Sequence, residues 1–204
     1  MRINEIEFEK EKKYLQITKD VIKKLISERT EEINNKRMAV VENKKHLWQN
    51  LREYSDAEMY NTMDDEDLNV SIINSEIIKV ARLERSLETP YFGRVDFKTN
   101  NTESIYIGLT SVSKDNTDYV CDWRAKAANL YYNYGLGQVE YETQDGIISG
   151  EVTLKRQFKI EMGSLLEVFD SDVALEDEML QEILLSSSDD KMKNIVSTIQ
   201  KEQN

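Results

Sequence analysis

Proline, glycine, cysteine and histidine are all scarce in this chain of 204 residues, which holds one proline, seven glycines, Cys121 and His46. A single cysteine excludes an internal disulfide, and the N-terminus is too rich in Glu and Lys to be a secretory signal. We therefore expect a reduced, cytoplasmic location. A single histidine excludes metal sites built from several imidazoles, and we expect no metal site in this chain.

Long apolar runs and excess positive charge are also lacking. No run approaches the roughly 20 apolar residues that a membrane-spanning helix needs. The net charge is −12, with 39% hydrophobic and 32% charged residues, a balance typical of a protein with a large exposed surface. Proteins that neutralise nucleic-acid phosphates show a basic face. We therefore expect neither direct nucleic-acid binding by this chain nor contact with a membrane.

The first 89 residues predict an antiparallel coiled-coil arm, because no Gly or Pro interrupts residues 3–89. One helix is expected over about 4–52, about 70 Å long, and a shorter returning helix over about 66–87. Apolar residues recur every seven positions in the first helix, as in a coiled-coil seam: Ile26, Ile33, Val40, Leu47 and Tyr54.

An acidic turn is expected between these helices, over residues 56–69, and we call its carboxylate residues the acidic tip. They are Asp56, Glu58, Asp64, Asp65, Glu66 and Asp67, with no Lys or Arg among them. The tip is a candidate partner-binding site, because carboxylates suit Mg²⁺ and a negative surface can occupy a basic channel. Electrostatic blocking, ligation of the ion and a merely solvated turn remain alternatives.

The N-terminal half of the first helix extends beyond the expected reach of the second helix, which pairs back only to about Glu32. Its apolar residues need burial, either against the following domain or against a second copy of the chain. Self-association through residues 1–31 is thus one of two alternatives.

Residues 90–170 change to the short β-branched and aromatic runs of strands, and predict a small antiparallel β-sheet or barrel of five or six strands. Asp145-Gly146 is a strong hairpin signal. In the strand that follows, Val152, Phe158 and Ile160 are expected on one face. Arg156 falls on that apolar face, where it needs a carboxylate or carbonyl partner.

Residues 171–204 return to helical spacing, and the chain ends at Gln203-Asn204 without a helix stop signal, as a truncated segment would. The fold class is therefore α+β, with an arm at 1–89, a β domain at 90–170 and a helical segment at 171–204. No nucleophile–base pair and no G-x-x-x-x-G-K-[ST] phosphate loop occurs, so this chain is not expected to be an enzyme by itself.

Several segments, in this order, resemble the N-terminal part of the HelD family, UvrD/Rep-like superfamily 1 ATPases that recycle bacterial RNA polymerase. The segments are Pro90–Phe97, Tyr106–Gly108, Asp122–Ala125, Leu130–Tyr132, Leu154–Phe158 and Lys191–Asn204. The resemblance implies RNA polymerase core as the partner, with the arm in its secondary channel and the acidic tip near the active centre.

The same resemblance implies that the closing helices lead into a motor domain, with ATP and Mg²⁺ as cofactors of the full-length protein and none in this segment. It also implies that Gln203 belongs to a Q motif that contacts adenine. The competing hypothesis is a structural coiled-coil module that mediates self-association or docks a DNA helicase.

Overall fold

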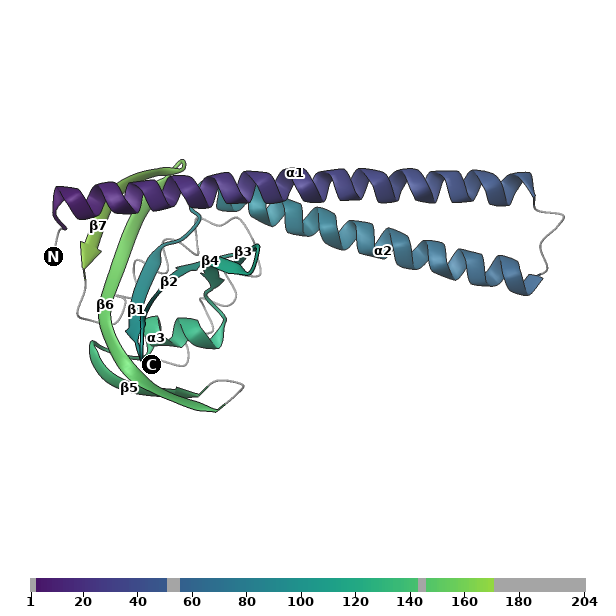
Figure 1. Ribbon diagram of the computed structural model, residues 1–204. Coiled ribbons are helices and arrows are strands. Elements are labelled where there is room, and N and C mark those ends of the chain that lie inside the picture. The colour runs from purple at the N-terminus through teal and green to yellow at the C-terminus, as the bar shows by residue number, and fades with distance from the viewer. Residues whose placement is uncertain (1–2, 51–55, 143–145, 171–204) are drawn as a thin grey trace, which may run out of the picture.

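A long helical arm projects from a body built around a curved sheet (Figure 1). The computed structural model describes residues 3–50, 56–142 and 146–170, and for residues 56–66 and 142 the backbone alone. The helical elements are α1 (Glu5–Gln49), α2 (Asp56–Ser86), a 3₁₀ turn (Lys126–Ala128) and α3 (Asn129–Tyr132). The strands are β1 (Gly93–Lys98), β2 (Thr102–Gly108), β3 (Val112–Lys114), β4 (Thr117–Asp122), β5 (Gly137–Glu142), β6 (Ile147–Glu161) and β7 (Ser164–Asp170). The fold class is α+β.

Helix α1 begins where expected, because the Asn4 side chain accepts a hydrogen bond of 2.8 Å from the Glu7 backbone N–H. Its 45 residues give a length of about 68 Å. Helix α2 has 31 residues and a length of about 46 Å, because it already begins at Asp56. The predicted turn over residues 56–69 is therefore wrong, since this backbone is helical.

Two sequence signals explain the early start of α2. Carboxylates near a helix N-terminus are stabilised by the helix dipole, and Asp56 and Glu58 lie there. The sequence Ser55-Asp56-Ala57-Glu58 also has the spacing of a capping box, in which Ser or Thr is followed three residues later by Glu. A negative segment without Gly or Pro is thus compatible with a helix.

The two long helices pack against each other near the body. Ile33 of α1 and Ile73 and Leu83 of α2 are buried, and Arg29 Nη1 lies 2.8 Å from Glu76 Oε2. This pair extends the contact between α1 and α2 toward the N-terminus of α1, past Glu32, where we expected the contact to stop. Toward the far end the helices separate in Figure 1, and Leu68 is 60% exposed. The structure does not confirm a coiled-coil seam along the whole arm.

The sheet is mixed and has seven strands, in the order β3-β4-β2-β1-β6-β5, with β7 on β6. Strands β2 and β4 run parallel, with Ile107 opposite Cys121, so the expectation of a purely antiparallel sheet is wrong. The reason is the three-residue strand β3, which runs antiparallel to β4 and turns the chain around before β4 begins. The antiparallel pairing of β5 with β6 confirms that these strands form a hairpin, while Asp145 of the expected turn lies outside the described residues.

The sheet is covered on both faces. Helix α1 packs on one face, over a core that includes Tyr106 and Phe158, and α3 packs on the other, beside Val95 and Val152. A bulge opposite Asp96 and Phe97 inserts one extra residue into β6 and reverses which face its side chains occupy. We expected Val152 to share a face with Phe158, and this prediction is wrong because of the bulge.

The N-terminal half of α1 is buried against this sheet. Leu15 and Ile22 lie in the same core as Tyr106 and Phe158. Tyr14 stacks on Tyr106 with ring centroids 3.8 Å apart. Of the two alternatives for the overhanging half, the structure thus shows packing on the following domain of the same chain.

Candidate partner-binding site

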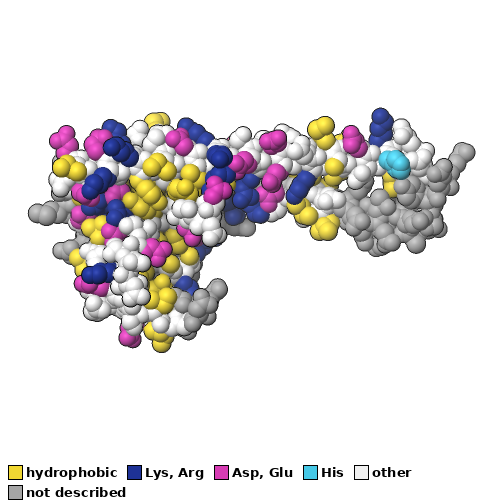
Figure 2. All heavy atoms as spheres, viewed as in Figure 1, with side chains coloured by type: hydrophobic (Ala, Val, Ile, Leu, Met, Phe, Trp, Pro, Cys, Tyr) yellow, Lys and Arg dark blue, Asp and Glu magenta, His cyan; other side chains and the backbone are white. Residues whose placement is uncertain are grey.

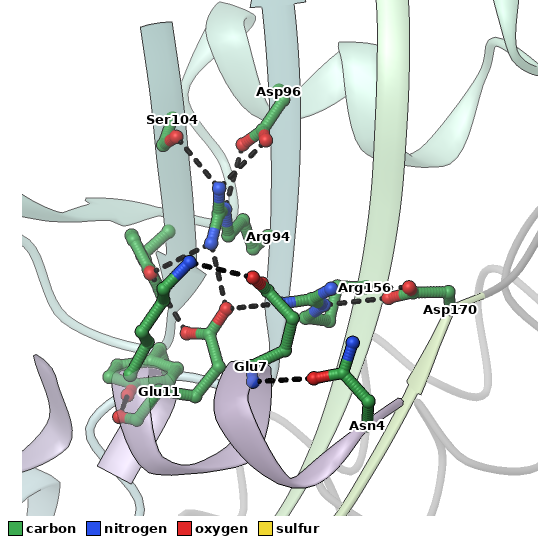
Figure 3. A network of polar contacts seen from close by, with 11 residues as sticks. Asn4, Glu7, Glu11, Arg94, Asp96, Ser104, Arg156 and Asp170 are labelled. Carbon is green, nitrogen blue, oxygen red and sulfur yellow. Dashed lines mark hydrogen bonds and ion pairs between the residues drawn. The ribbon is translucent and has the colours of Figure 1, made fainter. Parts of the chain in front are cut away.

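The arm is fixed to the body by buried charges that meet at Glu11 of α1 (Figure 3). Glu11 is 1% exposed, and its Oε1 accepts hydrogen bonds from Arg94 Nη1 at 2.7 Å and Arg156 Nη1 at 2.6 Å. Its Oε2 accepts from the Tyr106 hydroxyl at 2.9 Å. One carboxylate on the helix therefore binds donors from β1, β2 and β6 together.

The two arginines are neighbours across the β1–β6 pair, where Arg94 lies directly opposite Arg156. Like charges at such positions repel, so each guanidinium needs carboxylates of its own. Arg94 forms two bonds of 2.7 Å to Asp96, and Arg156 bonds to Asp170 at 2.6 and 3.1 Å. We call this set the anchor network, with these members: Glu7, Glu11, Arg94, Asp96, Arg156 and Asp170.

The protonation equilibria reflect this arrangement. Burial opposes the charged form of Arg94, but the hydrogen bond to Asp96 and the surrounding charges outweigh it and raise its pKa. Burial, reinforced by the Glu11 charge, raises the pKa of Tyr106. Hydrogen bonds from Lys10 and then Arg156 lower the pKa of Glu7. Arg94 therefore stays charged and Tyr106 neutral at physiological pH, which preserves the donors that Glu11 accepts.

Arg156 was predicted to need a carboxylate or carbonyl partner on its apolar face, and the structure shows two carboxylates there, Glu11 and Asp170. Sequence reasoning missed Glu11 itself. Its signal is its position, because it continues toward the N-terminus the buried stripe of Leu15, Thr18 and Ile22 at spacings of three and four. A charged residue on a buried stripe indicates an opposite charge on the facing element.

Further contacts follow α1 toward the arm. Lys19 Nζ donates to the Gly163 carbonyl at 2.8 Å, and Lys114 Nζ lies 2.6 Å from Glu28 Oε2. After Arg29, which pairs with α2, the helix continues to Gln49 for about another 30 Å. The first half of α1 is thus a long anchor, and the second half projects.

The acidic tip lies in the first turns of α2, at the end of the arm far from the body (Figure 1). Asp67 is exposed. The side chains of the other five tip residues lie outside the described residues: Asp56, Glu58, Asp64, Asp65 and Glu66. Gln203 and the helical segment expected over 171–204 also lie outside them.

A second buried cation lies under the opposite face of the sheet. Lys155 is 2% exposed, donates to the Tyr134 carbonyl, and lies 5.5 Å from the centroid of the Tyr131 ring. Burial lowers its pKa.

No group of three or more His, Cys, Asp or Glu residues that could hold a metal occurs in the described ranges. Within those ranges, no helix has the length and apolarity needed to cross a bilayer.

The fold is thus an α+β body that anchors a projecting pair of helices through a buried ion network. The sequence matches the family described as DNA helicase IV HelD, N-terminal domain, over residues 8–183. The chain belongs to this family, which confirms the resemblance seen in its motifs. A search of curated proteins gives no match.

Proposed function

We propose that this chain is the non-catalytic N-terminal region of a HelD-type ATPase, and that its arm inserts into the secondary channel of RNA polymerase. There the acidic tip would lie near the active centre and help to release nucleic acid. The observation that carries the proposal is the arm, which continues well beyond its anchor and has six acidic residues at its far end.

Charge and position both support this role. The four consecutive carboxylates Asp64, Asp65, Glu66 and Asp67 lie beyond the first turn of α2 and repel one another, so they contribute little to folding. Such a segment competes with nucleic-acid phosphates for a basic channel. The mechanism we favour is electrostatic occupation of that channel, because it requires no defined coordination of an ion.

The family implies ATP and Mg²⁺ for the full-length protein. This chain has no G-x-x-x-x-G-K-[ST] segment, so its own residues do not fit the phosphates of ATP. Gln203 would contact adenine in the complete motor, and no step of the proposal depends on it. The alternative of self-association through residues 1–31 loses its motivation, because Leu15 and Ile22 are buried within the chain.

The test compares full-length proteins in a transcription and complex-release assay. Asp64, Asp65, Glu66 and Asp67 are changed together to Asn or Gln, which leaves the fold intact because it removes repulsion. We expect polymerase binding to weaken only modestly, while release of nucleic acid falls. Normal release by the neutral variant would show that the tip is a spacer whose charge is incidental.

A matched control removes four exposed carboxylates elsewhere. Glu5, Glu84, Glu88 and Glu103 are exposed and lie near the body end of the molecule. Their change to Gln alters net charge by the same amount, so we expect release to stay at the wild-type level. An equal loss in both variants would mean that net charge, rather than the position of the tip, determines activity.

A further inference from the structure

The projecting half of α1 carries a row of exposed apolar side chains. Met38 is 64% exposed, Val41 66% and Trp48 69%. We call these three residues the outer stripe. Their spacings of three and seven place them along one side of the helix. Figure 2 shows hydrophobic side chains reaching the surface along the arm, close to Lys and Arg side chains.

The outer stripe is distinct from the buried face of the same helix. That face carries Ile33 and Leu47, which are 5% and 6% exposed. At about 100° of rotation per residue, the outer stripe is turned roughly a third of a turn away from it. The α2 contact therefore does not explain these apolar residues. A surface helix that needs only solubility would carry polar residues at these positions.

The charges around the stripe indicate what it would bind. Arg37, Lys44 and Lys45 are exposed on this part of the helix, against one acidic residue, Glu42. The surroundings of the outer stripe are thus positively charged, in a chain whose net charge is −12. Trp, Met and Arg are also the residue types enriched at protein–protein interfaces.

We infer that the outer stripe is the surface through which the arm binds its partner protein, and that it fits an apolar helix with acidic flanks on that partner. This inference rests on the proposed function, in which that partner is RNA polymerase. The spacing of the stripe resembles one side of a coiled-coil seam, so a helix laid along it would bury all three residues together. The acidic flanks would face Arg37 and Lys45.

The test measures the affinity of the 204-residue chain for purified core polymerase by biolayer interferometry. Met38→Ala, Val41→Ala and Trp48→Ala are combined, because Ala keeps the helix intact. We expect affinity to fall at least about thirtyfold, as for loss of a central interface cluster. The control, Asn35→Ala with Asn43→Ala, changes exposed positions on another side of α1 and should bind as wild type.

A second variant tests the charge. Arg37→Glu with Lys45→Glu should weaken binding and reverse its dependence on salt, since complementary charges become like charges. A photo-crosslinker at Val41 should capture an acidic helical segment of polymerase. Capture of a basic surface would overturn the inference.

These experiments distinguish a failure of the proposed function from a failure of the inference about the outer stripe. If the wild-type chain does not bind polymerase, the proposed function fails and takes this inference with it. If the wild type binds and the triple variant binds equally well, the inference alone fails. If light scattering shows a wild-type dimer that the triple variant abolishes, the stripe binds a second copy of the chain, which also overturns it.

Discussion

Replacing Glu11 by Ala is the most direct test of how the arm is held. Glu11 is 1% exposed and receives three hydrogen bonds, two of them from guanidinium groups. After its removal, Arg156 still pairs with Asp170 and Glu7, and its side chain is only 4% exposed. Breaking a buried ion pair by removing one partner costs about 3–5 kcal/mol. Because the remaining carboxylates retain part of the pairing, we expect about 3 kcal/mol.

Glu11→Gln should cost less, about 2 kcal/mol, because the amide oxygen still accepts one hydrogen bond from an arginine. The free energy of unfolding is measured by urea titration, followed by far-ultraviolet circular dichroism. Glu9→Ala is the control, since Glu9 pairs with Lys12 and both side chains are more than half exposed. Exposed pairs of this kind contribute less than about 1 kcal/mol.

A double-mutant cycle then separates the interaction from loss of packing. Glu11→Ala and Arg156→Ala should be non-additive by about 1 kcal/mol or more, because the two side chains are in contact. Additive effects, or a loss below about 1 kcal/mol for Glu11→Ala alone, would refute the view that this network anchors the arm.

Two further predictions concern the arm and the tyrosines. Val40→Asp or Ile77→Asp places a charge at a half-buried position and should cost about 1–3 kcal/mol, fraying the arm while the near-ultraviolet signal of Trp123 persists; simultaneous loss of that signal would show one cooperative unit. Burial raises the pKa of Tyr14 to about 12, and that of Tyr91 is also raised, mainly by burial. A raised pKa in the folded state contributes stability that is present below the ordinary value of 10 and lost as pH rises above it. The tyrosinate absorbance of these two residues, isolated as the difference between the wild type and a Tyr14→Phe, Tyr91→Phe variant, should therefore appear together with unfolding in an alkaline titration, and its appearance in a protein that stays folded would contradict this.

Local patterns were enough to predict the elements and one contact. The long stretch without Gly and Pro predicted two helices, and alternation predicted β5 and β6. Arg156 on an apolar face indicated a carboxylate or carbonyl partner, and the structure shows a carboxylate. These features depend on residues close in sequence, or on the cost of burying a charge. That cost applies whatever the partner turns out to be.

Non-local geometry was not predictable in the same way. The bulge in β6 depends on its pairing with β1 and changes the face on which Val152 lies. Strand β3 has three residues, too few for an alternating pattern, yet it determines that β4 runs parallel to β2. The position of Glu11 on the stripe of α1 indicates a buried charge, but its partners could not be identified from the sequence, because they come from two distant strands.

The position of the anchor network limits how far the distal end of the arm moves when its base shifts. Any looseness at the base of a lever is multiplied by the ratio of the free length to the held length. Helix α1 is held from Glu7 to Arg29 and projects from there to Gln49, and each part is about 30 Å long. Looseness at the base therefore reaches the far end without amplification. Had only the last turn before the free part been fixed, about 5 Å long, the same looseness would grow about sixfold. The buried ion network lies near the N-terminal end of α1, at the largest distance from the projecting half. A carboxylate placed there therefore limits the tilt of the projecting half most.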